Sequence, residues 1–265
     1  MGEPAEQLPV TSSVPVRLPE PQELLFREVL TRLEEEHLPF AVSGAVALQQ
    51  HTGICRFTKD LDLFLSPANA NRALPILARQ GFECEVQDPV WLAKARRDGF
   101  FVDLITGMSN GTITVDEEWV QRAHSATVLG VKTRVLAPEE LIASKLFITR
   151  RERFDGADIV HVVYALGGRL DWQRILELAG EHWELVLWAL LLFRYVYPAQ
   201  THYVPQSIWQ ELLGRFEGEV RSPNPKARFR GSLIDDKMFA IDIEEWGLDD
   251  ILKENQARRT KIEAV

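Results

Sequence analysis

The spacing of apolar and polar residues in the first quarter of the chain predicts a helix, a strand, a second helix and a second strand. Apolar side chains at helical intervals predict an amphipathic helix over residues 21–37. A short apolar strand then leads into a turn of small residues at Ser43-Gly44, which opens the second helix. The next strand, over residues 60–65, alternates aspartate with apolar residues. We interpret this segment as the one around which the rest of the chain is organised.

Further along, the pattern predicts two more strands, over residues 82–86 and 100–105, and a β-hairpin over residues 126–135 that turns at Leu129-Gly130. From Pro138 onward the periodicity is almost entirely helical. The helices expected after the first two cover residues 67–80, 139–150, 157–166, 171–179, 182–195, 206–216 and 249–257.

These elements predict an α+β fold, in which a mixed sheet with flanking helices is followed by a helical domain and a C-terminal arm. The start of the chain contains several prolines and little periodicity, which favours a flexible segment. The end is too rich in aromatic and apolar residues for a disordered tail, so we expect it to fold back. The expected parts are a flexible N-terminal arm (1–20), a mixed α/β domain (21–137), a helical domain (138–216) and a C-terminal arm packed on the body (217–265).

Asp60 and Asp62 stand on one face of their strand, because side chains along a strand alternate between its two faces. Two carboxylates side by side repel each other unless a cation lies between them. A divalent ion with oxygen ligands, such as Mg²⁺, is the natural occupant, and it commonly keeps positions open for substrate phosphates. The pair therefore predicts a metal site.

Two further features extend this site. Backbone N–H groups at the start of the helix after Ser43-Gly44 favour an anion such as a phosphate. Asp103 interrupts an apolar strand, where a carboxylate is costly unless it is paired or bound to a metal. The alternative for Asp103 is a solvated edge or a cap on the turn that follows. A phosphate cradle followed by an Asp-x-Asp strand is typical of a nucleotidyl-transfer site.

The two motif blocks resemble a known family. The residues that carry the resemblance are Ser43, Gly44, Arg56, Thr58, Asp60 and Asp62. Together they look like the glycine-serine plus Asp-x-Asp signature of the DNA polymerase β-like nucleotidyltransferase superfamily. Within it, the chain is most similar to the AbiEii-type nucleotidyltransferases, which include bacterial toxins, over roughly residues 40–164. The resemblance implies a nucleotidyltransferase fold, a nucleoside triphosphate (NTP) as substrate and two Mg²⁺ ions.

The resemblance also implies roles for individual residues. Metal ligation and catalysis are expected from Asp60, Asp62 and Asp103. Nucleotide binding is expected from Ser43, Gly44, Thr58, Lys59, Lys145, Arg150, Asp155 and Asp158. The turn here is Ser-Gly, where the family usually has Gly-Ser or Gly-Gly, so a shift of the first phosphate contact is expected.

Lys145 falls within the apolar arc of its expected helix, where a merely solvated lysine would be unusual. Its long stem can lie along the packed face while the ammonium reaches into a cleft, where a triphosphate is a fitting partner. The alternative is a buried lysine paired with a structural acid. Arg150 belongs to a basic run that suits either phosphates or the end of the helix dipole. Asp155 and Asp158 fit either a helix cap or the family's second motif block.

Composition narrows the class of protein. With 46% hydrophobic and 26% charged residues, the chain is typical of a soluble globular protein. A net charge of −9 argues against a broad surface that coats nucleic acid. The two cysteines lack metal-binding spacing and are expected as reduced thiols. We see no signal peptide and no apolar run that could span a bilayer, and we expect a cytoplasmic protein without a membrane partner.

The leading hypothesis is transfer of a nucleoside monophosphate (NMP) from an NTP to an acceptor hydroxyl or phosphate. Candidate acceptors are tRNA or another RNA, a protein, or a small molecule such as an antibiotic. A toxin-like role, with a cognate antitoxin as partner, is a further candidate. The alternative of another class is a catalytically silent nucleotide-binding module that acts as a regulatory or interaction subunit.

Overall fold

The computed structural model describes residues 18–263. Residues 1–17, which make up most of the expected flexible arm, lie outside the described residues. Within the described part, no helix is both long and apolar enough to cross a membrane.

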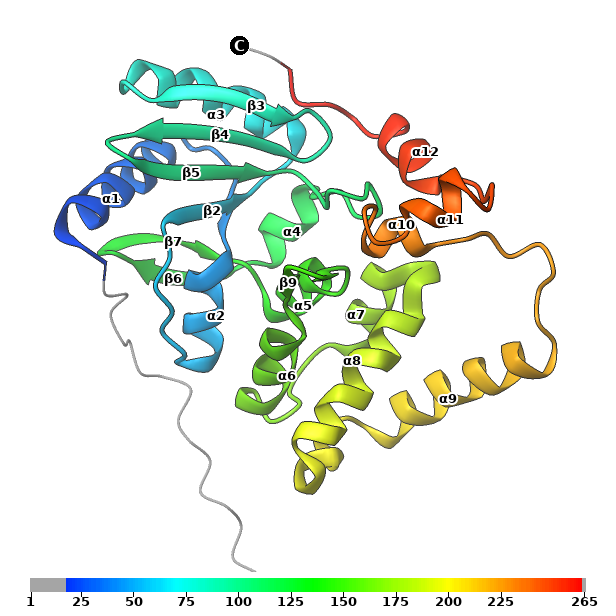
Figure 1. Cartoon of the computed structure of the whole chain (residues 1–265). Coiled ribbons are helices and arrows are strands. Elements are labelled where there is room, and N and C mark those ends of the chain that lie inside the picture. The colour runs from blue at the N-terminus through cyan, green and yellow to red at the C-terminus, as the bar shows by residue number, and fades with distance from the viewer. Residues whose placement is uncertain (1–17, 264–265) are drawn as a thin grey trace, which may run out of the picture.

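A mixed sheet of seven strands forms the centre of the molecule, in the order β3-β4-β5-β2-β1-β7-β6 (Figure 1). The strands are β1 (Ala41–Val42), β2 (Asp60–Phe64), β3 (Glu83–Asp88), β4 (Leu92–Arg97), β5 (Phe100–Ile105), β6 (His124–Val128) and β7 (Val131–Val135). Strand β2 lies in the middle, antiparallel to β1 and parallel to β5. The expected α+β fold with a mixed sheet is confirmed.

Four helices belong to the sheet region: α1 (Glu20–Glu35), α2 (Gly44–Thr52), α3 (Pro67–Arg79) and α4 (Glu117–Arg122). Helices α1 and α3 pack against the sheet and against each other. Leu61 and Leu63 of β2 are fully buried in the core, while Asp60 and Asp62 point to the other face of the strand. The local sequence fixes the start of α3, because the Ser66 hydroxyl caps the Asn69 N–H and Pro67 occupies the first turn.

The helical region begins with α5 (Pro138–Lys145) and continues with α6 (Gly156–Ala165), α7 (Trp172–Ala179), α8 (Trp183–Val196) and α9 (Gln206–Arg221). Short 3-10 turns, η1 (Gly180–His182) and η2 (Pro198–Tyr203), precede and follow α8. The expectation that the first of these helices reaches Arg150 is wrong. A small hairpin of β8 (Thr149–Arg150) and β9 (Arg153–Phe154) replaces its last turn, because the Asp155 N–H donates to the Ile148 carbonyl at 2.9 Å.

The C-terminal arm carries three short helices, α10 (Gly231–Ile234), α11 (Ala240–Glu244) and α12 (Ile251–Ala257), and returns to the sheet (Figure 1). The Arg259 guanidinium donates to the carbonyls of Gly111 and Thr112, at 2.5 and 2.7 Å. The Ile262 N–H donates to the Pro89 carbonyl at 2.7 Å, in the turn between β3 and β4. The expected return of the arm to the body is confirmed.

Strand β4 was not expected from the sequence, although it lies next to β5. The two strands are joined at Asp98-Gly99, where both residues have positive φ angles, 53° and 80°. Asp-Gly with this geometry is a favoured two-residue hairpin turn. The hairpin matters for the site, because β4 places a lysine opposite Asp103.

Candidate active site

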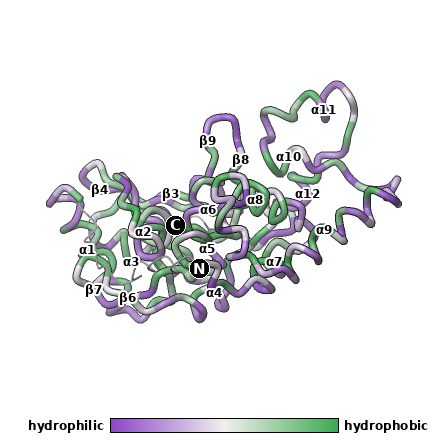
Figure 2. The backbone as a smooth tube through the Cα atoms, turned by 90° about the horizontal axis from the view of Figure 1, so that it is seen from below, coloured by the Kyte–Doolittle hydropathy of each residue, from purple (hydrophilic) through white to green (hydrophobic). Residues whose placement is uncertain are grey.

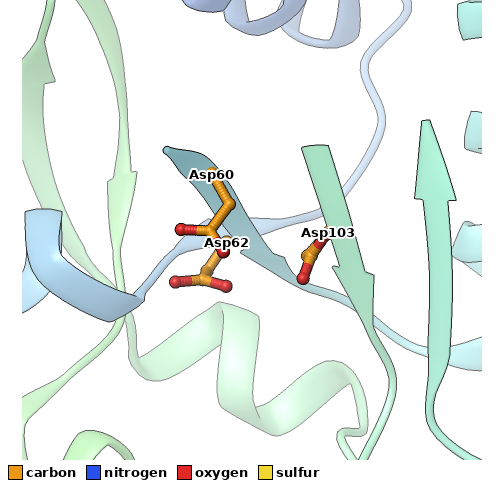
Figure 3. A group of neighbouring side chains, drawn as sticks. All are labelled: Asp60, Asp62 and Asp103. Atoms are coloured by element: carbon orange, nitrogen blue, oxygen red, sulfur yellow. The ribbon is translucent and has the colours of Figure 1, made fainter. Parts of the chain in front are cut away.

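Asp60, Asp62 and Asp103 converge at the centre of the sheet (Figure 3). Strands β2 and β5 run parallel, and Asp62 is in register with Asp103. One oxygen from each of the three carboxylates lies within 4.8 Å of the others. The sequence therefore correctly indicated that Asp103 joins the Asp-x-Asp pair, and the alternatives of a solvated edge or a turn cap are wrong for it.

Gly44 allows the first turn of α2 to approach Asp62 closely. A β-carbon at Gly44 would lie 1.8 Å from Oδ2 of Asp62, and the φ angle of Gly44 is +58°. The Ser43 N–H donates to the backbone carbonyl of Asp62 at 2.9 Å. Both residues of the turn thus contact the aspartate strand, and glycine is required at position 44 for steric and conformational reasons.

Burial and mutual repulsion both disfavour the ionised carboxylates of the cluster. Burial raises the pKa of Asp62 to about 7, with further increases from the negative charges of Asp60 and Asp103, while Lys145 and Arg153 counteract them. Burial also raises the pKa of Asp103, against the opposing effect of a hydrogen bond from Lys94. Carboxylates that repel each other in this way favour a divalent cation, and a set of hard oxygen donors suits Mg²⁺. The three residues fit such an ion.

A cavity of about 520 Å³ opens beside the carboxylates. The predicted site residues that line it are Ser43, Gly44, Thr58, Asp60, Asp62, Asp103, Lys145, Arg150, Asp155 and Asp158. Lys59 is the exception, since it is exposed and does not contribute to the lining. The structure thus brings together ten of the eleven residues selected from the sequence.

Thr58 holds the first aspartate in place. Its hydroxyl donates to Oδ1 of Asp60 at 2.6 Å, and its own carbonyl accepts a hydrogen bond from the Gln22 side chain at 2.9 Å. Gln22 belongs to α1 and is buried. The N-terminal helix therefore supports the orientation of Asp60 through a chain of two hydrogen bonds.

Lys145 is buried and forms ion pairs with Asp155 at 2.9 Å and with Asp158 at 2.8 Å. Arg153 donates to both oxygens of Asp155, and Arg56 pairs with Asp158. Burial by itself would raise the pKa of Asp155, but the hydrogen bonds and charges of Arg153 and Lys145 outweigh it and lower that pKa.

Lys145 shows features of both alternatives that the sequence left open for it. Lys145 is paired with acids, and it also lines the cavity. Asp155 precedes α6 as expected of a cap residue, but its carboxylate makes no capping hydrogen bond. It holds Lys145 and Arg153 instead. Arg150 lies on the β8–β9 hairpin and donates to the Ser109 hydroxyl at 2.8 Å.

Part of the cavity lining is apolar. Trp91, Ile105 and Met108 contribute to it, and Leu233 reaches it from the C-terminal arm. Asn110, which is buried, donates from its amide to the Leu233 carbonyl at 2.9 Å and so fixes the arm at this place. No local sequence pattern indicates this wall, because it joins residues more than a hundred positions apart.

Lys94 is the principal site residue that the sequence interpretation missed. Its ammonium lies 2.7 and 2.8 Å from the two carboxylate oxygens of Asp103. The Asp98-Gly99 turn was the available signal, because a two-residue hairpin sets Lys94 and Asp103 directly opposite each other.

Residues 23–184 match the model of a protein family described as Nucleotidyl transferase of unknown function (DUF2204). This match covers more than half of the chain. The chain belongs to this family. For this DUF2204 protein the matched region includes every predicted site residue, and the nucleotidyltransferase class expected from the motifs is confirmed. The finer resemblance to AbiEii-type enzymes stays a prediction.

Comparison with solved structures finds matches that share little sequence with this chain. The antibiotic-resistance factor ANT(2'')-Ia is 16% identical, with 70% of this chain and 98% of that chain covered and a TM-score of 0.44. A putative nucleotidyltransferase from Thermotoga maritima is 18% identical, with 51% and 90% covered and a TM-score of 0.41. The lincosamide antibiotic adenylyltransferase LnuA is 14% identical, with 56% and 98% covered and a TM-score of 0.40. No curated protein matches the sequence significantly.

Proposed function

We propose that the protein transfers an NMP from an NTP to an acceptor and releases pyrophosphate. The observation that carries this proposal is the convergence of Asp60, Asp62 and Asp103 on one cavity. These carboxylates would hold two Mg²⁺ ions. When bound, the ions would neutralise charge on the triphosphate and lower the pKa of the acceptor hydroxyl.

The turn at the start of α2 would bind the triphosphate. Backbone N–H groups at a helix N-terminus attract phosphate oxygens. Gly44 touches the Asp62 carboxylate, so a phosphate bound at this turn would lie next to the acidic cluster. Thr58 would keep Asp60 aimed at the cavity, and Lys59 would steady the loop that leads into β2.

A second group of residues, around Lys145, would add positive charge near the nucleotide. Lys145 and Arg153 act on the pKa of Asp62, so their charges reach the acidic cluster. Asp155 and Asp158 would orient Lys145, and Arg150 would hold the rim of the cavity. In the transfer step the acceptor oxygen forms a bond to the α-phosphorus while the bond to the pyrophosphate oxygen breaks, and the proton of an acceptor hydroxyl passes to water. The protein positions both groups and neutralises charge.

A small molecule is the acceptor that the cavity favours. The apolar residues Trp91, Ile105, Met108 and Leu233 in the lining would suit the uncharged part of a small acceptor. RNA is a second candidate, because the β8–β9 hairpin carries exposed arginines and projects beside the arm (Figure 2). Replacing Arg151 by alanine should reduce transfer to RNA at low salt and leave transfer to a small acceptor unchanged.

The proposal is tested by mixing the protein with Mg²⁺ and each labelled NTP, ATP among them, with and without candidate acceptors. We expect pyrophosphate release by the wild type, and none by Asp62→Asn with its fold intact by circular dichroism. Wild-type rates in that variant would contradict the assigned site. NTP binding without release under all conditions would favour the silent module.

The resemblance to AbiEii-type enzymes adds one more prediction, a toxin-like role with a cognate antitoxin. Expression of the wild type should then slow bacterial growth, while expression of Asp62→Asn should not. Equal growth of the two strains would argue against a toxin-like role. It would not argue against the proposed transfer reaction.

A further inference from the structure

Phe57 is an exposed aromatic residue at the edge of the cavity. Its exposed fraction is 69%, and it belongs to the cavity lining. Within residues 18–263, its ring stacks on no other ring and does not pack against the core. A single exposed apolar residue is ordinary on a protein surface. At the edge of a binding cavity, however, an aromatic ring without a partner offers a flat face to a ligand.

The residues on both sides of Phe57 are held in place. Arg56 forms an ion pair with Asp158. The Thr58 hydroxyl donates to Oδ1 of Asp60 at 2.6 Å, and the carbonyl of the same threonine accepts a hydrogen bond from a side chain of α1 at 2.9 Å. The backbone at Phe57 is therefore fixed before any ligand binds. A contact made by a prearranged group costs less entropy on binding.

Apolar residues of the lining lie at both ends of β2. Phe57 precedes the first residue of the strand, whereas Ile105 is in register with the last, Phe64. Trp91 lies at the same end as Ile105, because β4 begins opposite that residue. At about 3.3 Å per residue, the two ends of β2 are about 13 Å apart. Asp62 lies between them, so the cavity offers two separate apolar places.

Two cationic residues of the lining are linked to the Phe57 end. Arg56 is the neighbour of Phe57 and pairs with Asp158, which in turn lies 2.8 Å from the ammonium of Lys145. Both Arg56 and Lys145 line the cavity. A triphosphate is bound best where positive side chains are available. The nucleotide therefore fits the Phe57 end, and the end at Trp91 is left for the acceptor.

We propose that Phe57 stacks on the base of the bound NTP and favours purine over pyrimidine bases, because a purine offers the larger ring surface. The inference rests on the proposed function, since it takes an NTP as the ligand of this cavity. Stacking on an aromatic side chain accepts any base, since every base has a flat face. Phe57 thus distinguishes bases by the size of the ring and not by their hydrogen-bonding edges.

Two other roles for Phe57 have different consequences. If the side chain only keeps the shape of the loop, its removal weakens binding of a bare triphosphate as much as binding of a nucleotide. If it contacts the acceptor, its removal raises the KM for the acceptor and leaves nucleotide binding unchanged. Phe216 offers a matched control, because it is a phenylalanine on α9 that is 51% exposed and does not line the cavity.

The test is isothermal titration calorimetry of the full chain with Mg²⁺ and the α,β-methylene analogues of ATP and UTP, in which the bond that would break is blocked. Inorganic tripolyphosphate serves as the ligand without a base. We expect the wild type to bind the ATP analogue about threefold or more tightly than the UTP analogue. Phe57→Ala should weaken binding of the ATP analogue about tenfold and reduce the preference for it, while the affinity for tripolyphosphate changes less than about twofold.

Replacement by another aromatic residue separates stacking from bulk. Phe57→Trp should bind the ATP analogue at least as tightly as the wild type, because it keeps a flat ring. Phe57→Leu keeps an apolar side chain without the ring and should lose most of the affinity that Phe57→Ala loses. Phe216→Ala should bind like the wild type.

An unchanged affinity of Phe57→Ala for the ATP analogue would overturn the proposal, and so would an equal loss for tripolyphosphate. A rise in the KM for the acceptor alone would also overturn it and would assign Phe57 to the acceptor. Failure of the proposed function gives a separate result. A wild type that binds the analogues but releases no pyrophosphate from ATP would contradict the transfer reaction and leave the stacking contact in place, whereas a wild type that binds no nucleotide would overturn both.

Discussion

Gly44 brings the first turn of α2 against the carboxylate of Asp62, and no other residue fits there. An alanine at this position would collide with Oδ2 of Asp62 and would adopt an unfavourable positive φ angle. We predict that Gly44→Ala lowers the rate of transfer by about a hundredfold or more, because the carboxylate must move by roughly an ångström. The measurement is pyrophosphate release at saturating NTP.

Gly53 provides the control for this change. It ends the same helix with a φ angle of +74°, and a β-carbon there would meet nothing within 4 Å. Gly53→Ala should therefore lose about 1 kcal/mol of stability and keep its activity. Equal activity in the two alanine variants would show that the contact between Gly44 and Asp62 has no functional consequence.

His51 gives the protein a pH dependence of stability that is independent of the acidic cluster. Burial lowers its pKa from 6.5, although Nε2 donates to the Leu136 carbonyl at 2.8 Å. Above pH 6.5 the ring is neutral in both the folded and unfolded states, and its contribution to stability is fully present. As the pH falls below 6.5, the unfolded chain binds a proton at His51 that the folded chain does not bind, and stability is lost.

We predict that the wild type loses more stability than His51→Gln between pH 7.5 and 5.5, with a difference in slope of up to about 1.4 kcal/mol per pH unit. The measurement is urea unfolding at both pH values. His202→Gln is the control, because that side chain is exposed. If the free energy of unfolding of His51→Gln changed with pH as steeply as that of the wild type, His51 would not be the source of this pH dependence.

At the scale of elements, the segment from α5 to α6 is held together by charge. Lys145 at the end of α5 pairs with Asp155 and Asp158 at the start of α6, and all three are buried. Removing Lys145 would leave the buried carboxylates of Asp155 and Asp158 with less positive charge beside them. We predict that Lys145→Met lowers the free energy of unfolding by about 3 kcal/mol.

The triple variant Lys145→Met, Asp155→Asn and Asp158→Asn should recover part of this loss, because it leaves no buried charge unpaired. Arg215→Met, which breaks a surface pair with Glu211, should cost less than about 0.5 kcal/mol. Denaturant titration compares the variants. If Lys145→Met lowered the free energy of unfolding as little as Arg215→Met does, the buried ion pairs would not stabilise the segment.

The same elements show what a sequence can reveal. The Asp-x-Asp strand and the small-residue turn were predictable, because alternation and turn chemistry are local properties. Strand β4 was overlooked because half of its residues are charged, so it lacks an apolar pattern. The end of α5 was placed too late because Leu146 and Phe147 continue its apolar face into the turn.

Long-range contacts account for the rest of what was missed. The pairing of Lys94 with Asp103 follows from strand register, and register becomes known only once the hairpin is recognised. The contact between Asn110 and Leu233 joins the sheet region to the arm across 123 positions. No local pattern in the sequence encodes such a contact, because it depends on how the whole chain folds.

At the scale of the whole molecule, the C-terminal arm completes the cavity. Asn110 fixes the arm at Leu233, which forms part of the cavity wall. We predict that Asn110→Ala loosens this wall and raises the KM for the acceptor several-fold, because the Leu233 carbonyl loses its buried donor. The KM for the NTP should change little, since the hydrogen bond between Asn110 and Leu233 does not involve the turn at Ser43-Gly44.

Hydrogen exchange of residues 231–263 reports directly on the attachment of the arm and should be faster in Asn110→Ala. Asn224→Ala is the control, because Asn224 is exposed and its side chain caps its own turn at the Lys226 N–H. If the KM for the acceptor and the KM for the NTP rise equally in Asn110→Ala, the arm affects the fold as a whole and has no separate role in binding the acceptor.

The proposed function depends on one arrangement, in which three aspartates bind divalent ions that hold a triphosphate at the start of α2. The most direct test is a crystal structure with Mn²⁺ and a non-hydrolysable NTP, using the anomalous signal of the metal. We predict Mn²⁺ peaks about 2.1–2.3 Å from oxygens of Asp60 and Asp62, with the triphosphate against Gly44. A nucleotide bound elsewhere, with no metal at these carboxylates, would contradict the account.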